Sequence, residues 1–532
     1  MNNIKNIAIR GKIVIIFITS ILLHSIIAAY LKKPGCYFDE LLYTSIAECI
    51  KNKTEFKALG LKVGFSRYVY SLTLLPAYIA SNIKTRQIII GVINSILYSL
   101  GIFPLYLINK KLEIKDNINI LCCIMYTIYS DSVYTQTFMA ENLIIPLELL
   151  GIYLILIEKL WLAGVIFGIG FYAKSITVLY PVFAYTNIKK SWKIWLSIIG
   201  IVIINRLFNF GLDESALKFE FHSLYSLYAV IYLMLKALLM FGIIPIISNK
   251  NKFISYSLRI IAISIICESL FISNIESYPN INVATNFRYF SFLFIPILGI
   301  YLNNCEKINI NKLVVRYGII CIIETILLYI TRNLKDEEFY KCTLFHLENK
   351  LGNKLWIVFI LLNLFIITGF LIKKSEFFRV FNIILISFTI VNSISINYDM
   401  IKSNNINYQE QDLQKLQLIK DKNLLIVCES YIDLINTQNI DLYTNRDTAY
   451  KIYIKDYKND SNSWNEFFET QDIKNISVSK WFIERNKSFD KVDYILTKNK
   501  NIDNIDEIEY LKNIDYYLIK LRDNKKVPNL DS

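Results

Sequence analysis

Residues 13–31 read IVIIFITSILLHSIIAAYL, an almost wholly apolar run without a charged side chain. An α-helix needs about 20 such residues to cross the hydrocarbon core of a bilayer. Similar runs, rich in Ile and Leu and without two-residue alternation, recur as far as about residue 395. Backbone groups in lipid are satisfied only in helices or closed barrels, and the alternation of a barrel strand is missing. The sequence therefore predicts an all-α polytopic membrane domain.

The composition supports a membrane protein over a nucleic-acid-binding one. Of the 532 residues, 54% are hydrophobic and only 19% are charged, against about 25% charged in soluble domains. The net charge is +13, but Lys and Arg sit largely between apolar runs, where membrane topology explains them. We therefore expect the bilayer, and no nucleic acid, as a partner. The nine cysteines form no CxxC and no metal-type spacing with the three histidines.

We expect about 13 transmembrane helices. The first is expected to be retained, because no small-residue cleavage site precedes Lys32. Basic residues, such as Lys110, Lys111 and Lys115, recur in alternate breaks. The positive-inside rule then places the N-terminus in the cytoplasm. The expected helices are 13–31, 87–108, 117–131, 140–157, 160–174, 175–188, 194–210, 227–248, 253–272, 289–303, 313–331, 354–372 and 379–396.

Two segments outside these helices stand out. The first outer loop, 32–86, exceeds ordinary connection lengths and is predicted to be functional. Within it, the apolar stretch 67–83 is interrupted by Pro76 and is predicted to be an interfacial or re-entrant helix. Residues 1–399 would thus form the membrane domain. Residues 400–532 would form a small extracytoplasmic α/β domain, with short buried strands NLLIVCE (423–429), VDYILT (492–497) and YYLIKL (516–521).

An acidic pair, Asp39-Glu40, follows the outer end of the first helix and opens an amphipathic stretch that reaches Ile50. A carboxylate at the membrane interface can act as a general base toward a sugar hydroxyl. The alternative is structural, because Asp favours helix N-caps and acidic residues favour the first turn. Position alone leaves both interpretations open.

Further acidic candidates flank the next outer break. Glu141 opens a helix and could bind substrate, and Asp131 lies nearby. Acidic residues at the edge of a span tend to be functional or paired, although Glu141 could also simply stabilise a helix N-terminus. Asp131 and Glu141 are the candidates for a divalent cation. Glu148, two turns deeper, is interpreted as a buried polar partner for a neighbouring helix.

Basic candidates complete the set. Arg288-Tyr289 precedes a late apolar helix; Arg can bind phosphate oxygens, or the pair can anchor the helix at the interface. Lys174 ends an apolar run on the outer side, where it could meet a lipid phosphate or merely extend toward the headgroups.

Together these motifs resemble the GT-C glycosyltransferases, multi-span enzymes that use polyprenyl-phosphate sugars. Among them are protein O-mannosyltransferases and the aminoarabinose transferases of lipid A. The resembling stretches are FDELLYTSIAECI (38–50), RQIIIGVINSILYSLGIFPLYLINKKL (86–112), YTQTFMAENLIIPLELLGIYL (134–154), AGVIFGIGFYAK (163–174) and RYFSFLFIPIL (288–298). Many members carry His-Pro-Pro in the first loop, whereas residues 64–68 here read GFSRY. The resemblance thus favours the bacterial group that modifies envelope glycans or lipids.

The resemblance implies an inverting transfer from a polyprenyl-phosphate sugar to a glycan, lipid or protein acceptor outside the membrane. Asp39 would be the base, and Glu40 would orient it or the acceptor. Arg288, with Lys174, would stabilise the leaving phosphate. A transporter of lipid-linked glycans is an alternative, but it favours mid-span charges and internal repeats. A scaffold without catalysis is a third possibility, and it would tolerate Asp39→Asn.

Overall fold

The structure is a computed structural model with two compact units. The helical unit comprises residues 1–30, 91–136 and 140–403, and the second unit comprises 31–90, 137–139 and 404–532. The residues that the structure describes are 2–31, 38–53, 57–58, 61–62, 68–80, 83–207, 251–267, 289–307, 318, 322, 374–404, 424–428, 450–453, 494–497, 505–511 and 516–521.

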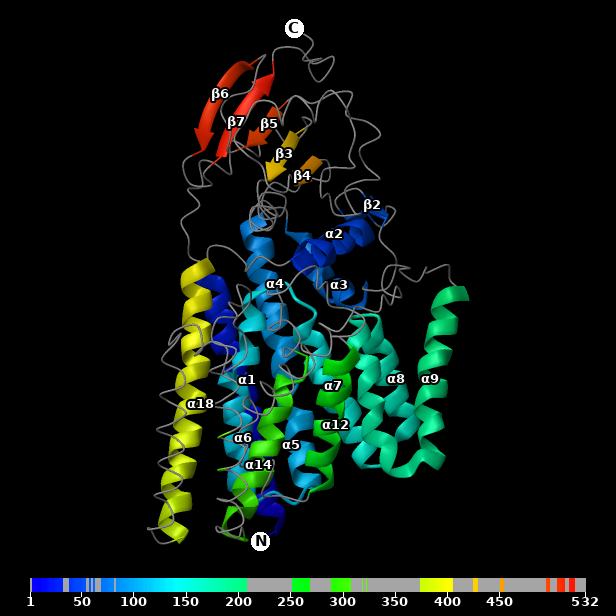
Figure 1. The fold of residues 1–532 in the computed structure, drawn as a ribbon, viewed down its shortest axis with the longest axis vertical. Helices are drawn as coiled ribbons and strands as arrows, with labels where there is room; N and C mark the ends of the chain where they lie inside the picture. Colours follow the sequence, from blue (N-terminus) through cyan, green and yellow to red (C-terminus); the bar gives the residue numbers. More distant parts are fainter. Residues whose placement is uncertain are drawn as a thin grey trace. The chain divides into compact units, whose positions relative to one another are not determined.

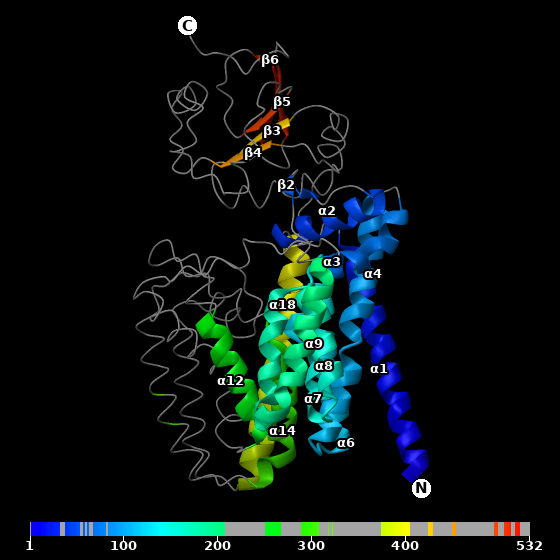
Figure 2. The ribbon, with the colours of Figure 1, turned by 90° about the vertical axis from the view of Figure 1, so that its right-hand side faces the viewer.

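The helices of the helical unit run along a common direction (Figures 1 and 2). The α-helices are α1 (Asn2–Tyr30), α4 (Ile83–Ser99, whose first turns belong to the second unit), α5 (Ile102–Lys111), α6 (Asp116–Ile128), α7 (Glu141–Leu156), α8 (Leu160–Phe171), α9 (Ile188–Leu207), α12 (Lys252–Cys267), α14 (Phe294–Asn304) and α18 (Lys374–Asn404). The 3₁₀ segments are η3 (Ser130–Gln136), η4 (Ser175–Asn187), η7 (Ser291–Leu293) and η8 (Cys305–Lys307).

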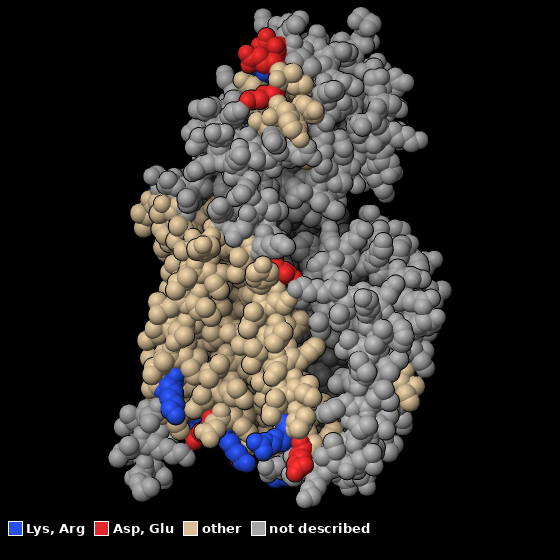
Figure 3. All heavy atoms as spheres, turned by 90° about the vertical axis from the view of Figure 1, so that its left-hand side faces the viewer, with Lys and Arg blue, Asp and Glu red and all other residues tan. Residues whose placement is uncertain are grey.

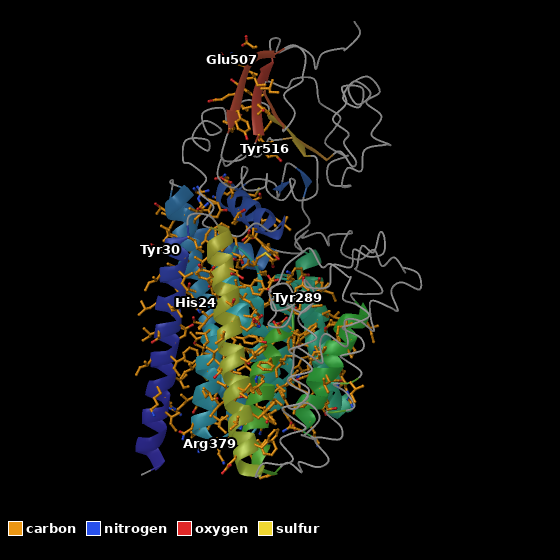
Figure 4. The ribbon with its side chains drawn as sticks, turned by 60° about the vertical axis from the view of Figure 1, so that its left-hand side comes forward. His24, Tyr30, Tyr289, Arg379, Glu507 and Tyr516 are labelled. Carbon is orange, nitrogen blue, oxygen red and sulfur yellow. The ribbon has the colours of Figure 1, made fainter. Side chains whose placement is uncertain are left out.

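Three helices of the described part are long and apolar enough to cross a membrane: Ile9–Tyr30, Thr85–Lys111 and Glu376–Asp399. Many apolar side chains of the first and third are exposed, as lipid-facing residues would be; Ile26 is 65% exposed and Val391 66%. Figure 3 shows a face of the helical unit that is nearly free of charge over most of its length, with Lys and Arg gathered near one end. Arg379 of α18 lies toward that end (Figure 4).

The expected count of 13 spans stays a prediction, because the expected helices 227–248 and 354–372, and all of 313–331 except residues 318 and 322, lie outside the described residues. Several expected spans differ in detail. The segment expected as a helix over 175–188 is the 3₁₀ segment η4, and the helix expected over 117–131 ends at Ile128, where η3 soon follows. Polar and short side chains from 130 to 137 (SDSVYTQT) favour this local tightening over a continuous α-helix.

The helix expected over 87–108 is divided into α4 and α5 at Leu100-Gly101. Gly101 is required there, because a Cβ at this position would collide with the Tyr126 hydroxyl. The rings of Tyr98 and Tyr126 stack with centroids 4.7 Å apart. The Tyr126 hydroxyl donates to the Tyr98 carbonyl at 3.1 Å, and the Tyr98 hydroxyl donates to the Tyr126 carbonyl at 3.0 Å. Each tyrosine hydroxyl thus donates to a backbone carbonyl near the end of the other tyrosine's helix, α4 or α6.

Glycines allow α8 to pack closely on its neighbours. A Cβ at Gly164 would lie 2.6 Å from the Ile194 carbonyl oxygen of α9, and one at Gly168 would crowd Ile201. Such small residues are typical of helix contacts inside membranes, where backbones approach closely. The resulting α7–α8–α9 arrangement brings the start of α7 to the same end as the last turn of α8.

The second unit contains the first-loop elements and a C-terminal sheet. The loop folds as α2 (Phe38–Asn52), the short hairpin β1 (Lys57–Ala58) and β2 (Leu61–Lys62), α3 (Tyr68–Leu74) and η2 (Leu75–Ile79). Thus the stretch interrupted by Pro76 is helical on both sides of the proline, with a change to 3₁₀ geometry at Leu75. A proline fits the first turn of a helical segment, where its missing N–H is not needed.

The sheet has five strands in the order β4-β3-β5-β7-β6. They are β3 (Leu424–Cys428), β4 (Tyr450–Tyr453), β5 (Tyr494–Thr497), β6 (Ile505–Leu511) and β7 (Tyr516–Leu521). β3 runs parallel to β4 and β5, whereas β7 runs antiparallel to β5 and β6. The three predicted strands coincide with β3, β5 and β7; β4 and β6 were not expected.

Candidate active site

The acidic pair lies in the first turn of α2, which begins at Phe38. Asp39 has helical backbone, and its side chain lies outside the described part of the structure. The Glu40 side chain is fully buried, and its Oε1 accepts a hydrogen bond from the Phe138 backbone N–H at 2.6 Å. Thr44 Oγ1 donates to the Glu40 carbonyl at 2.8 Å. The structure thus gives Glu40 a backbone partner about a hundred residues away in sequence.

Packing within the second unit holds α2 against α3 and η2. The Tyr78 hydroxyl donates to the Thr44 carbonyl at 2.6 Å, and the guanidinium of Arg86 lies 4.5 Å from the centre of the Tyr78 ring. Leu42 and Ile46 form the apolar core of this contact. Because a buried helix face and a buried hydroxyl fix α2, the acidic turn sits on a rigid element.

An ion pair joins the basic and acidic candidates of the helical unit. Lys174 Nζ lies 2.8 Å from Glu141 Oε1, with side chains 8% and 0% exposed. The same ammonium lies 4.8 Å from the centre of the Tyr289 ring. Glu141 is the first residue of α7, and the Lys174 N–H donates to the Gly170 carbonyl at 2.7 Å, closing the last turn of α8. The α7–α8 hairpin therefore brings Glu141 and Lys174 together, and Tyr289, just before η7, joins them.

This group lies toward the end of the helical unit opposite Arg379, since Tyr289 is seen there in Figure 4. A buried ammonium in contact with one carboxylate and one aromatic face has a favourable local environment. It is also a cation held away from bulk water, where its interaction with an anion is stronger than at a surface.

Asp131 is buried in η3, between α6 and α7, and accepts a hydrogen bond from the Ser291 hydroxyl. Burial raises the pKa of the Asp131 carboxyl to about 8, the Ser291 hydrogen bond opposes this shift, and the charge of Glu141 adds to it. Asp131 therefore favours its protonated form near neutral pH. Glu148, also fully buried, is close enough to interact electrostatically with Glu141 and Lys174.

The remaining candidates are less well defined. Arg288 lies outside the described residues. Among the residues that the structure describes, no group of three or more His, Cys, Asp and Glu side chains is arranged to hold a metal ion. Asp131 and Glu141 thus stay predictions as ligands of a divalent cation.

Sequence reasoning missed three residues at these sites. They are Phe138, which donates to Glu40, Ser291, which donates to Asp131, and Tyr180, whose hydroxyl donates to the Tyr289 carbonyl. A signal existed for Ser291, which follows the selected Tyr289 by two residues.

The fold is shared with two solved ArnT structures, in agreement with the family resemblance of the motifs. The chain is similar to ArnT from Cupriavidus metallidurans bound to undecaprenyl phosphate, with a TM-score of 0.52, 9% identity and coverage of 97% of this chain and 99% of that one. For ArnT of the same organism in the apo state the TM-score is 0.51, the identity 10% and the coverage 95% and 97%. No protein-family model and no curated protein sequence matches the chain. The likeness is therefore one of fold.

Proposed function

We propose that the protein is an inverting glycosyltransferase, which moves a sugar from a polyprenyl-phosphate donor to a cell-envelope acceptor on the outer face of the membrane. The observation that carries the proposal is the buried Lys174 ammonium, which lies 2.8 Å from Glu141 in a chain with this fold. A structure with the same fold is bound to undecaprenyl phosphate. A leaving lipid phosphate gains charge that a lysine ammonium can stabilise through a charge-assisted hydrogen bond.

In the proposed reaction, the acceptor hydroxyl oxygen attacks the anomeric carbon of the donor sugar. The bond from that carbon to the phosphate oxygen breaks, and its electron pair leaves with the lipid phosphate. Asp39 takes the hydroxyl proton as the new bond forms. Lys174 and Arg288 stabilise the charge that grows on the phosphate. A single displacement of this kind inverts the anomeric carbon.

Glu141 and Tyr289 are proposed to complete the substrate site. Glu141 would bind sugar hydroxyls or a divalent ion as well as Lys174, and Tyr289 would support the lysine through its ring face, which lies 4.8 Å from Nζ. Residues 1–399 would form the catalytic membrane domain and 400–532 the extracytoplasmic domain, with the N-terminus in the cytoplasm. The acceptor would be a glycan, lipid or protein.

The test is complementation of a knockout strain by the wild type and by Asp39→Asn, with envelope glycolipids compared by mass spectrometry. The matched control is Asp116→Asn, because Asp116 also stands in the first turn of a helix. Loss of a general base costs about 10²–10⁴-fold in rate. We therefore expect a hexose- or pentose-sized modification to disappear with Asp39→Asn and to persist with Asp116→Asn, at equal membrane levels of both variants.

Full restoration of every glycolipid by Asp39→Asn would refute Asp39 as the base and favour a transporter or a scaffold. A knockout that lacks no modification but accumulates lipid-linked glycan in the inner leaflet would refute transfer and indicate a flippase. If neither Asp39→Asn nor Asp116→Asn restores the modification, the acidic residues of both helix turns would have a structural role.

A further inference from the structure

Glu40 makes a contact that a second catalytic carboxylate would not need. Its side chain is fully buried, and Oε1 lies 2.6 Å from the Phe138 nitrogen. A backbone N–H has no proton to exchange in glycosyl transfer, so the bond holds geometry and performs no chemistry. An ionised acceptor makes such a bond shorter and stronger than a neutral acceptor does.

Phe138 belongs to a short stretch, Thr137–Met139, that joins η3 to α7 and belongs to the second unit. Glu141 follows Phe138 by three residues and is the first residue of α7. Fixing the Phe138 amide therefore fixes the backbone just before the residue that holds Lys174.

The segment is also held from within the helical unit. Asn142 Nδ2 donates to the Tyr134 carbonyl at 2.7 Å, which closes the chain around the junction. Gln136 Nε2 donates to Asn397 Oδ1 at 2.8 Å, and Asn397 Nδ2 donates to Ser132 Oγ at 3.2 Å. These bonds constrain both ends of the junction, and Glu40 constrains its middle.

We propose that Glu40 is a positioning residue: its carboxylate fixes the Phe138 backbone and thereby sets where α7 begins and where Glu141 meets Lys174. The adjacent residues of the acidic pair thus divide two tasks, with Asp39 as the base and Glu40 as the tie to the cation site. The effect on turnover rests on the proposed function, whereas the tie itself does not.

Glutamine distinguishes positioning from acid–base chemistry, because its side-chain carbonyl can accept the same N–H but cannot take up a proton. The experiment compares Glu40→Gln, Glu40→Ala and the wild type, purified in nanodiscs. Glu48→Ala is the matched control, since it removes a partly exposed glutamate from the same helix. The readouts are amide hydrogen exchange of a peptide that covers residues 137–139, and the rate and pH profile of transfer from an extracted polyprenyl-phosphate sugar pool.

We expect Glu40→Ala to speed exchange at residues 137–139 and to reduce turnover by about 10²-fold, the cost of a small misplacement of catalytic groups. We expect Glu40→Gln and Glu48→Ala to keep slow exchange, to turn over within about tenfold of the wild type and to share its pH profile. If Glu40→Ala does not fold, the pH profile of Glu40→Gln decides.

Two results would overturn the inference. In the first, the amides of residues 137–139 exchange slowly in Glu40→Gln, but this variant is as inactive as Glu40→Ala or loses one limb of the pH profile. Glu40 would then take part in the chemistry. In the second, Glu40→Ala leaves amide exchange at residues 137–139 unchanged. Glu40 would then not hold the Phe138 backbone in place. If the wild type transfers no sugar, the proposed function fails, while the exchange comparison still decides whether the tie exists.

Discussion

Replacing Lys174 by methionine tests the buried ion pair directly. Methionine keeps most of the length of lysine but removes the ammonium that lies 2.8 Å from Glu141 Oε1. Because the Glu141 side chain is 0% exposed, its carboxylate would remain in the interior without that cation. Breaking a buried pair in this way costs about 3–5 kcal/mol, and the lost contact with the Tyr289 ring adds about 0.5–2 kcal/mol.

A double variant separates stability from function. In Lys174→Met/Glu141→Gln neither charge remains, and uncharged replacements of a buried pair are often neutral. We expect most of the lost stability to return while sugar transfer stays lower by about 10²–10³-fold, because no ammonium faces the leaving phosphate. The exposed pair Lys520–Asp506, at 2.8 Å with side chains 38% and 45% exposed, provides the control; Lys520→Met should leave stability nearly unchanged, because solvent screens an exposed pair.

The assay is reversible unfolding in mixed micelles, with transfer measured on the same preparations. Equal, small losses for Lys174→Met and Lys520→Met would refute the buried pair. A double variant as unstable as the sum of the two single variants would show that the charges do not interact. Full transfer activity in the double variant would refute the phosphate role of Lys174.

Further predictions concern packing, protonation and the support of η3. Gly164→Ala should lower the thermal midpoint, because overpacking costs about 1–3 kcal/mol, whereas Gly200→Ala, with open space around its Cβ position, should not. Burial raises the pKa of the Asp131 carboxyl to about 8, so the folded state holds this proton more tightly than the unfolded chain does. Stability is therefore full below pH of about 4 and falls as pH rises through 8. Asp131→Asn should flatten the corresponding fall in the thermal midpoint. Asn397→Leu should destabilise the protein by about 1–3 kcal/mol in the micelle assay, because the buried Gln136 amide loses its acceptor.

Each of these has a contrary outcome. Equal midpoints for the two glycine variants would show that the α8–α9 contact can relax. An unchanged pH dependence in Asp131→Asn would assign the fall to other groups. A neutral Asn397→Leu would show that α18 does not support η3 through its amide.

The lengths of the apolar runs alone predicted most helices of the described part. In lipid, the cost of exposed backbone groups leaves few conformations other than the helix. These lengths could not predict the break at Leu100-Gly101, since the cause is a side chain from α6 that occupies the glycine site. In the sheet, the apolar strands β3, β5 and β7 were predicted. β6 (IDEIEYL) was missed because its charged residues hide a strand whose positions 506–510 are exposed.

The contact between Glu141 and Lys174 follows from their places in the sequence, whereas the contact of Glu40 does not. Glu141 opens a helix and Lys174 closes the next, so an antiparallel hairpin was enough to bring them to one end. The bond from Glu40 to Phe138 spans 98 residues in sequence. It uses a backbone N–H, which every residue except proline possesses. No pattern of side chains signals such a partner, and only the tertiary structure reveals it.

The stacked tyrosines at the α4–α5 break have a consequence for which substitutions this chain can accept as it evolves. Each hydroxyl is a second donor to the other residue's carbonyl, because the Tyr98 carbonyl also accepts from the Gly101 N–H at 3.0 Å and the Tyr126 carbonyl from the Tyr129 N–H at 3.3 Å. Phenylalanine at either position would leave the other residue's carbonyl with its backbone donor. Descendants of this chain should therefore replace either phenol more readily than Gly101, because a Cβ at Gly101 would meet the Tyr126 hydroxyl as long as that tyrosine stays.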